Sequence, residues 1–220
     1  MSESEKPRRP LRADARKNRE RILDAASTVF AREGLDASFD AVAAEAGVGV
    51  GTVYRRFPDR QLLINELFEA KVARFVALAE HCATMDNPFD GLIHFLTRAS
   101  RMHGEDLGLR EIVLGPGVDS DLMDLPRQTI APILSGLIDR AKANGDLRED
   151  FDVLDVPLIE LMLARINDLT GLVSPALWER LLTFVIDGLK VRRDGVTAMP
   201  ADPLTPADYL TAIRNFSDQS

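Results

Sequence analysis

The segment "AGVGVGTVYRRFPDR", residues 46–60, combines glycines and arginines in a pattern that suits hydrogen bonding to a large anionic partner. On a helical wheel with about 100° per residue, Val53 marks the core side, and Gly51 and Arg55 fall about 160° and 200° from it. Gly51 leaves room for close approach, and the Arg55 guanidinium can donate two hydrogen bonds to guanine O6 and N7. The pattern therefore predicts a helix that reads bases in the major groove of double-stranded DNA.

Polar and basic side chains flank this predicted contact strip. Thr52 and Tyr54 lie at about 260° and 100° on the wheel, so their hydroxyls can reach the phosphate groups on either side of the groove. Arg56 and Arg60 add two cations nearby. Because phosphate contacts set the register of a protein on DNA without reading its sequence, these four residues are predicted to position the helix.

Residues that could support catalysis or bind a metal lack the spacing that such chemistry requires. His81, His94 and His103 are spaced too irregularly for a pair of metal ligands on one helix, and neither H-E-x-x-H nor C-x-x-C occurs. Asp90 and His94 are one turn apart and could share a metal, but such a pair usually forms a solvated face. The run GVGVG lacks the Lys-Ser/Thr of a phosphate-binding loop. The sequence predicts neither an enzyme, nor a metal site, nor a cofactor.

Three short helices must position the glycine- and arginine-rich segment. Residues 16–33 carry apolar side chains at helical spacing, namely Ile22, Ala25, Ala26, Val29 and Phe30. Ser38 is a suitable N-cap for a second helix that Gly47 closes, and its apolar face consists of Phe39, Val42, Ala43 and Ala46. A third helix should run from about Val50 to Phe57, because Pro58 follows. A glycine turn between the second and third helices predicts a helix-turn-helix unit.

The stretches "RILDAASTVFAREG" and "SFDAVAAEAGVGVGTVYRRFPDRQLL" resemble the DNA-binding domain of TetR-family transcriptional regulators over about residues 19–64. The shared features are the AGV turn, the GT-hydrophobe-Y-R-x-F pattern, and the P-D-R with leucines that follows. The resemblance implies base contacts by Val50, Gly51 and Arg55, and phosphate contacts by Thr52, Tyr54, Arg56 and Arg60. The wheel favours all of these except Val50, which lies at about 60°, nearer the core. Gly49 replaces the serine N-cap of many members, which predicts a looser helix before DNA binding.

Charge is distributed unevenly along the 220 residues, although the net charge is −8. Residues 1–65 hold 12 basic and 10 acidic side chains, whereas residues 66–220 hold 15 and 25. Residues 1–21 are more basic still, with 8 basic against 4 acidic side chains, so they suit a polyphosphate partner, or form a disordered terminus. The predicted domains are a basic arm (1–15), the helix-turn-helix domain (16–62), a helical body (63–193) and a tail (194–220).

The body reads as helix throughout, which predicts an all-α fold with a larger helical domain for effector binding and dimerisation. A helix from 61 to about 82 should join the two domains, and Pro88 fits the first turn of the next helix. Residues 104–125 contain four glycines, one proline and several aspartates and predict short helical pieces, after which a regular helix runs over 129–143 and ends at Gly145.

Two late segments, 155–171 and 174–190, are apolar on more than one side. Ser174 and Pro175 should open the second of them as N-cap and first residue. Such a pair is half of a two-fold four-helix bundle, and the resemblance also implies a homodimer that reads a two-fold operator. The alternative is an internal core in a monomer. The predicted interface residues are Leu158, Met162, Leu177, Trp178, Leu181, Leu182 and Val185.

The resemblance further implies that the body holds a small apolar or amphipathic effector. Binding of this effector moves the two DNA-binding domains of the dimer, so that they no longer fit adjacent major grooves. Adaptable or aromatic candidates for its contacts are Phe95, Met102, Met123 and Met162, and polar candidates are His94, Arg165 and Asn167. Each has a simpler alternative: methionine as core filler, His94 as a surface or satisfied core residue, and Arg165 as the partner of Asp168.

These observations predict a cytoplasmic, homodimeric repressor that an effector releases from DNA. A single cysteine, Cys82, the lack of an apolar run long enough for a membrane span, and the lack of a signal sequence favour that location. The alternative is a helical small-molecule-binding protein or enzyme whose helix-turn-helix does not bind DNA. In the tail, Thr205 and Pro206 could cap a short helix that docks near the dimer helices, through Tyr209, Leu210, Ile213 and Phe216.

Overall fold

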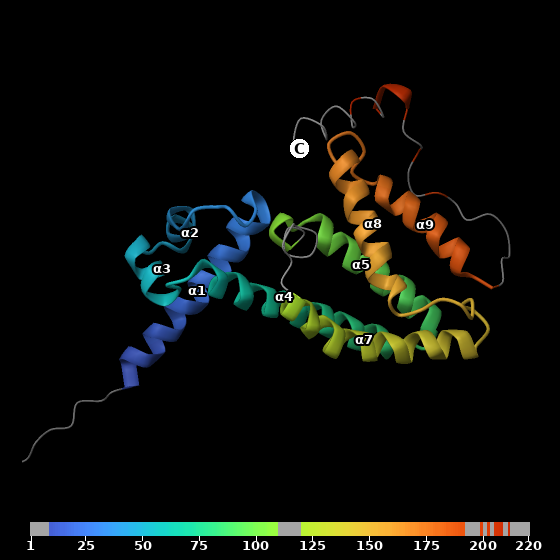
Figure 1. The fold of residues 1–220 in the computed structure, drawn as a ribbon, viewed down its shortest axis with the longest axis horizontal. Coiled ribbons are helices and arrows are strands. Elements are labelled where there is room, and N and C mark those ends of the chain that lie inside the picture. Colours follow the sequence, from blue (N-terminus) through green and yellow to red (C-terminus); the bar gives the residue numbers. More distant parts are fainter. Residues whose placement is uncertain are drawn as a thin grey trace, which may run out of the picture. The chain divides into compact units, whose positions relative to one another are not determined.

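The structure is a computed structural model that describes residues 9–109 and 120–191, the side chains of 17–109 and 124–191, and a few positions between 199 and 211. Within these residues the only β-type pairing is an isolated antiparallel bridge between Leu147 and Lys190, so the predicted all-α class is confirmed. The helices, labelled in Figure 1, are α1 (Arg9–Glu33), α2 (Phe39–Ala46), α3 (Val50–Arg56), α4 (Arg60–Ala83), α5 (Pro88–Gly104), α7 (Ser120–Ala143), α8 (Asp155–Thr170) and α9 (Leu177–Leu189).

The chain divides into two compact units between Lys71 and Val72, inside α4. The first unit contains α1, α2, α3, the first half of α4 and, among the described residues, 106–109. The second unit contains the rest of α4 together with α5, α7, α8 and α9. The helix that carries the predicted DNA contacts therefore lies in the first unit, and the predicted effector and dimer residues lie in the second.

The core of the first unit consists of the apolar faces that the helical spacing predicts. The five residues of α1 and the four of α2 named above are all buried, which confirms both faces. They pack with residues of α3 and α4, namely Val53, Phe57, Leu63, Leu67 and Phe68. Helix α1 begins at Arg9, seven residues before the predicted start, so part of the basic N-terminal segment is helical.

A buried ion pair attaches residues 106–109 to this first unit. The Lys71 side chain is only 5% exposed, and its Nζ lies 2.8 Å from a carboxylate oxygen of Asp106. The other carboxylate oxygen accepts the backbone N–H of Leu109 at 2.9 Å. Gly108 lies so close to α1 that an added Cβ would stand 3.0 Å from the carbonyl oxygen of Phe30. Charge pairing and this close backbone approach hold the segment together with α1 and α4.

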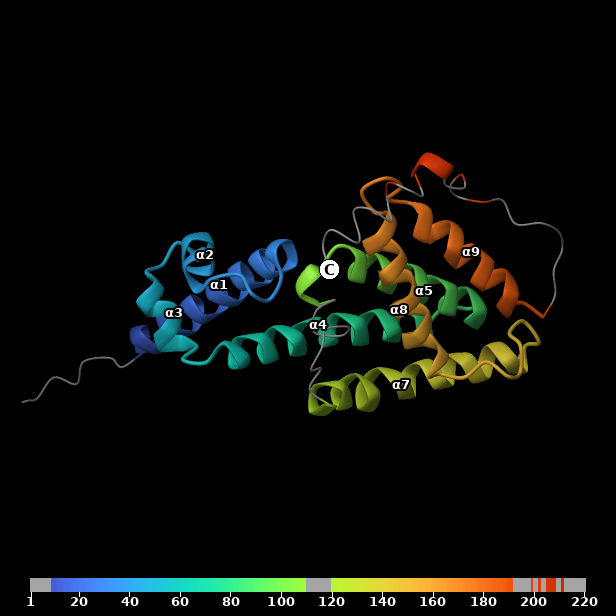
Figure 2. The same ribbon diagram turned by 45° about the horizontal axis from the view of Figure 1, so that its top comes forward.

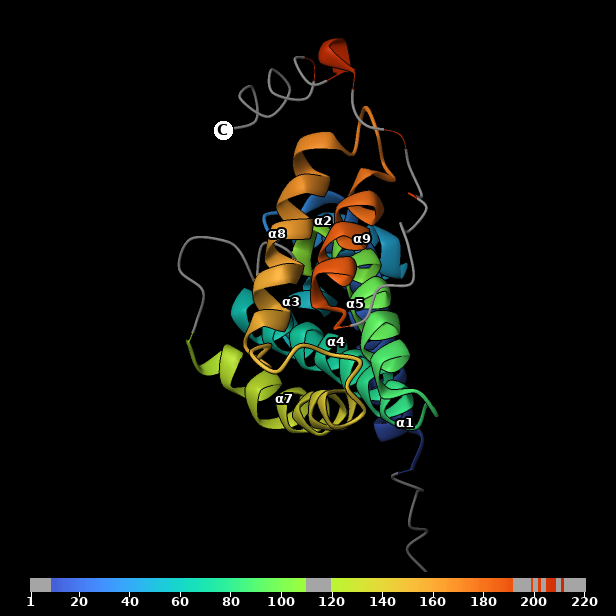
Figure 3. The ribbon, with the colours of Figure 1, turned by 90° about the vertical axis from the view of Figure 1, so that its right-hand side faces the viewer.

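The second unit is built around α5, which contacts α7, α8 and α9 (Figure 2). Helices α8 and α9 lie side by side (Figure 3). Asn87 caps α5 with its side-chain oxygen, which accepts the N–H of Phe89 at 2.9 Å, and Pro88 occupies the first turn as predicted. Leucines and aromatic residues fill the core, including Leu92, Phe95, Leu96, Leu137, Leu163, Trp178 and Leu182.

Two predicted helix boundaries in this unit are wrong. Helix α7 begins at Ser120 rather than near residue 129, so it includes the end of the segment predicted to form short helical pieces, and Pro126 lies inside it. Helix α9 begins at Leu177, and Ser174 is not its N-cap. The N–H of Ser174 instead donates to the carbonyl of Thr170 at 2.7 Å, so its backbone closes the end of α8. Local patterns misplaced both boundaries because tertiary packing overrides helix-breaking signals.

No helix within the described residues is both long enough and apolar enough to cross a membrane. In the tail, the hydroxyl of Thr205 accepts the backbone N–H of Asp208 at 3.2 Å, which is the predicted cap. The side chains predicted to dock there, those of Tyr209, Leu210, Ile213 and Phe216, lie outside the described residues.

Candidate nucleic-acid interface and effector region

The turn between α2 and α3 has the geometry that a helix-turn-helix requires. The Ser38 hydroxyl accepts the N–H of Ala41 at 3.1 Å and thereby caps α2. At the other end of α2, Gly47 adopts φ 62° and ψ 39°, a left-handed conformation in which glycine avoids a steric penalty. Gly49 is extended and begins α3, with its carbonyl accepting the N–H of Thr52 at 2.7 Å. Both predicted caps of α2 are confirmed.

Helix α3 buries one face and exposes the other, as the wheel predicts. Val53 and Phe57 are fully buried, so they fix the rotation of the helix about its axis. Gly51 and Arg55 are exposed on the opposite side, as is Tyr54, whose ring stands 5.0 Å from that of Phe39 on α2. The remaining predicted contacts follow the same division: Arg56 is exposed, and Val50 and Thr52 are half-buried.

Two of the exposed glycines of this region, Gly49 and Gly51, are not required by the packing of the protein. A Cβ added at Gly49 or Gly51 would meet no atom within 4 Å. Neither residue has the left-handed backbone of Gly47. Glycine in a helix costs up to about 1 kcal/mol relative to alanine, so this absence of side chains lowers stability without a compensating internal contact. An external surface that approaches the backbone closely is one physical reason for it.

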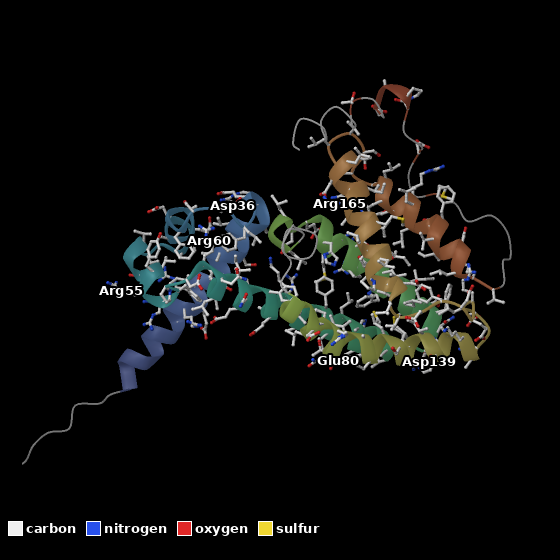
Figure 4. The ribbon with its side chains drawn as sticks, in the orientation of Figure 1. Asp36, Arg55, Arg60, Glu80, Asp139 and Arg165 are labelled. Carbon is white, nitrogen blue, oxygen red and sulfur yellow. The ribbon has the colours of Figure 1, made fainter. Side chains whose placement is uncertain are left out.

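Arg55 is oriented by a neighbour on its own helix. Its Nη2 donates to the hydroxyl oxygen of Thr52, one turn earlier, at 3.0 Å. Both side chains belong to the outward surface of α3, and Figure 4 shows Arg55 projecting from that helix. A guanidinium has five N–H donors, so this single bond leaves others for a base edge.

Arg60 has a different environment from the one that the sequence suggests. Its Nη1 donates to the backbone carbonyls of Leu35 and Ala37, the latter at 2.8 Å, and its guanidinium stands 5.3 Å from the centre of the Phe39 ring. These contacts tie the start of α4 to the loop between α1 and α2. The geometry therefore gives Arg60 a role in holding the helix-turn-helix together, and its phosphate contact stays a prediction.

Two arginines of α1 that the sequence analysis did not select also brace the unit. Arg21 donates to the carbonyl of Ala46, the last residue of α2, at 2.5 Å. Arg19 pairs with Glu66 on α4, and its guanidinium lies 4.6 Å from the centre of the Phe57 ring. Basic residues in a charged segment give no local signal of such contacts, because their partners are 25 to 47 residues away.

The seven predicted effector contacts lie in different environments. Phe95 is a core residue, whereas His94, Met162 and Arg165 are exposed, and Arg165 Nη1 lies 3.8 Å from the carboxylate of Asp168. The ring of His94 stands 6.0 Å from that of His81 on α4, at the surface. These positions fit the simpler alternatives considered for His94 and Arg165.

The other predicted effector residues are less exposed. Met102 and Asn167 are half-buried, and the Asn167 amide lies next to Gly104, 3.4 Å from where a Cβ on that glycine would stand. The side chain of Met123 is outside the described residues. Of the seven, Asn167 is thus placed in the contact between α5 and α8.

A buried polar pair that the sequence analysis missed lies in that same contact. The Ser100 hydroxyl on α5 donates to Oε2 of Glu160 on α8 at 2.9 Å, and both residues are buried. Burial raises the pKa of the Glu160 carboxyl from its ordinary value of 4.5 to about 8, and the hydrogen bond from Ser100 opposes that rise. The helical spacing could have identified Glu160 as a buried residue, because it follows Val156 by one turn and precedes Ala164 by one turn on the buried face of α8.

The predicted dimer residues divide into an inward and an outward group. Leu177, Trp178 and Leu182 are at most 8% exposed within one chain, and Trp178 lies beneath Arg101 of α5. They belong to the core of a single chain, because α9 also contacts α5, and this burial does not fit their predicted place in the dimer interface. In the outward group, Leu158 and Met162 are 62% and 43% exposed, and Leu181 and Val185 are half-buried. Two residues that were not predicted for the interface, Leu161 and Phe184, are 38% and 50% exposed on the same two helices and complete the set. We call this set the outer apolar face.

Sequence and structure comparisons place both units in known groups. Residues 22–67 match the bacterial regulatory proteins of the tetR family, and residues 87–191 match the C-terminal domain of SbtR-like transcriptional regulators. A curated relative, an HTH-type transcriptional regulator of Staphylococcus aureus strain USA300, is 36% identical over 67 residues, 30% of this chain. That match spans 36% of the relative's length, about a third.

Solved structures extend the similarity over most of the chain. A TetR transcription regulatory protein from Mycobacterium vanbaalenii is 33% identical with a TM-score of 0.58, covering 82% of this chain and 99% of that one. A TetR transcriptional regulator from Streptomyces coelicolor is also 33% identical, with a TM-score of 0.59, covering 78% of this chain and 98% of that one. The helix-turn-helix geometry and this similarity over nearly the whole length of two solved regulators show that the chain belongs to the TetR family of transcriptional regulators.

Proposed function

We propose that the chain binds double-stranded DNA as a homodimer and represses transcription until a small effector releases it. The observation that carries the proposal is the division of α3, which anchors Val53 and Phe57 in the core and leaves Gly51 and Arg55 on the outward surface. A rigidly held helix with a bidentate donor and a close-approach glycine on one strip is suited to reading bases. Tyr54 and Arg56 are exposed on the same helix and are proposed as phosphate contacts.

The outer apolar face supports the dimer part of the proposal. Leu158 is 62% exposed and Phe184 is 50% exposed, which is unusual for large apolar side chains that lie on adjacent helices. Covering this face with a second copy would bury it and would place two α3 helices on one two-fold molecule. Two recognition helices about 34 Å apart can enter successive major grooves, so the dimer would read a two-fold operator.

The effector part of the proposal rests on family membership and on the polar contact between α5 and α8. Regulators in this family pair a DNA-binding unit with a helical body that responds to a ligand. In this chain the body contains a buried carboxyl and a buried hydroxyl, those of Glu160 and Ser100, among mostly apolar core residues. Buried polar groups of this kind fix the orientation of ligands in pockets that are mostly apolar.

A mobility-shift assay with DNA from upstream of the protein's own gene tests the proposal. We expect a shifted complex that unlabelled DNA of the same sequence competes away and scrambled DNA of equal length does not. Retention that is equal for both sequences would contradict sequence-specific binding. It would favour a helical ligand-binding protein whose helix-turn-helix does not read DNA.

A further inference from the structure

Glu160 is the one carboxylate on the buried face of α8. It is 7% exposed, and its neighbours on that face, Val156, Leu163 and Ala164, are apolar and at most 5% exposed. A charge in such surroundings is unfavourable unless a partner compensates it, because the low-dielectric interior does not solvate ions.

Only half of this carboxyl has a partner within the described part of the chain. Oε2 accepts the hydrogen bond from Ser100 at 2.9 Å, whereas Oε1 is buried and accepts none from the described residues. Two arginines of the same two helices pair with other carboxylates: Arg101 of α5 with Glu179 at 3.1 Å, and Arg165 of α8 with Asp168; Arg98 of α5 is exposed. A buried oxygen atom without a hydrogen-bond partner costs about 1–3 kcal/mol, and among the described residues nothing satisfies the hydrogen-bonding capacity of Oε1.

The residue type at position 160 indicates which kind of ligand group would donate a hydrogen bond to Oε1. A glutamine at position 160 would accept the Ser100 hydrogen bond equally well and would not carry an ionisable group into the core. What a carboxyl adds to that bond is a negative charge. A negative charge acts strongly on a cation in a buried site, where Coulomb attraction is several times larger than in water.

We propose that Glu160, held in place by Ser100, is the anchor for a cationic effector, specifically a protonated amine carried on an apolar body. This proposal rests on the proposed function and names the chemical class of its effector. The ammonium group donates an N–H to Oε1, the oxygen that the described residues leave without a donor, and its charge is balanced by the carboxylate. The apolar body of the ligand would contact the apolar side chains that surround Glu160 on α8, those of Val156, Leu163 and Ala164.

The charge balance of binding supplies a specific signature. Because burial raises the pKa of Glu160 to about 8, the free protein at pH 7 holds this group mainly as the neutral acid. Pairing with an ammonium ion requires the carboxylate, so the carboxyl proton passes to the solvent when the ion pair forms. A neutral alcohol of the same shape binds without this release.

The test uses three amines of different shape, octylamine, 2-phenylethylamine and cyclohexylmethylamine, each compared with the matching alcohol. Isothermal titration calorimetry of the full-length protein at pH 7, in phosphate and in Tris, gives both the affinity and the number of protons released. We expect at least one amine to bind about tenfold or more tightly than its alcohol, with proton release. Glu160→Gln should abolish that preference, whereas Glu80→Gln, at an exposed carboxylate of α4 (Figure 4), should keep it.

Several results would overturn the proposal. They are equal binding of every amine and its alcohol by the wild-type protein, or an amine preference that survives in Glu160→Gln. A Glu160→Gln variant that melts at a lower temperature than the wild type without ligand would also overturn it, because the carboxyl would then serve the fold itself. None of these measurements includes DNA. A result that overturns the effector proposal therefore leaves operator binding untouched, and the mobility-shift assay tests operator binding separately.

Discussion

At the residue scale, replacing Arg55 by alanine should affect DNA binding, whereas replacing Arg60 by alanine should affect the stability of the fold. Arg55 is exposed and bonded only to Thr52 of its own helix within the described contacts, so Arg55→Ala should weaken operator binding by about 1–3 kcal/mol and relax preference at one base pair. Arg60→Ala removes two hydrogen bonds to loop carbonyls and should lower the melting temperature. Fluorescence anisotropy with operator and scrambled DNA, together with thermal melting, measures both. An equal loss of affinity for the two DNAs in Arg55→Ala would make Arg55 a phosphate contact.

Replacing Gly51 by alanine should raise the stability of the fold and lower the affinity for operator DNA. Since an added Cβ meets no atom of the protein, Gly51→Ala should stabilise the fold by up to about 1 kcal/mol. The same methyl group would stand between α3 and the DNA and should weaken operator binding. Gly136→Ala is the matched control, because Gly136 lies within α7 and its added Cβ also meets no atom. If Gly51→Ala bound operator as tightly as Gly136→Ala, close approach at this position would be ruled out.

At the scale of single elements, Ser38 and Ser174 should differ in their effect on stability, although the sequence predicts both as helix N-caps. Ser38 caps α2 through its hydroxyl, so Ser38→Ala should lower the free energy of unfolding by about 0.5–2 kcal/mol. Ser174 contributes backbone groups to the turn between α8 and α9, so Ser174→Ala should change it by less than about 0.5 kcal/mol. Urea denaturation of both variants measures the difference, and an equal loss would restore Ser174 as a cap.

The contact between α5 and α8 should make stability depend on pH. The pKa of Glu160 is raised in the folded state to about 8 from an ordinary 4.5, so the folded protein binds this proton more tightly than the unfolded chain. The stabilising contribution is therefore complete below about pH 4.5 and is lost as the pH rises towards 8, by up to about 1.4 kcal/mol per pH unit. Glu160→Gln should flatten this part of the profile in urea denaturation between pH 5 and 9. A wild-type profile that matches the variant would show that the carboxyl ionises normally.

At the scale of the whole molecule, the outer apolar face predicts the outcome of charge substitutions. Met162 and Phe184 are 43% and 50% exposed in one chain, so Met162→Glu with Phe184→Glu should leave the monomer folded and prevent dimer formation. Trp178→Glu should instead unfold the body, because Trp178 is buried within the chain. Light scattering and circular dichroism separate the two results. Leu62→Glu, at an apolar residue of α4 that is 50% exposed, should remain dimeric.

A dimer that survived the Met162 and Phe184 substitutions would place the interface elsewhere. In that case the two-fold arrangement of the α3 helices would need a different surface. Specific operator binding, which depends on two helices reading successive grooves, should fall much further in the double variant than in any variant that loses one phosphate contact.

The sequence by itself determined the helix-turn-helix, because its signals are local. Ser38 and Gly47 fix the ends of α2 within a few residues, and the helical period places Val53 inward and Arg55 outward. The same period identified α8 and α9 as helices that are apolar on more than one side. It did not show which side faces the chain's own core, since the spacing of apolar residues is identical for a core and for an interface.

Only the tertiary structure decided how residues distant in sequence meet. Arg60 reaches carbonyls 23 and 25 residues earlier, which gives it a supporting role in the fold that the sequence did not indicate. Trp178 is a core residue because α9 packs against α5. Glu160 pairs with Ser100, which is 60 residues away in the sequence. Caps and helical faces depend on neighbours within a turn or two, whereas burial and pairing depend on which helices pack together, and that follows from the three-dimensional fold.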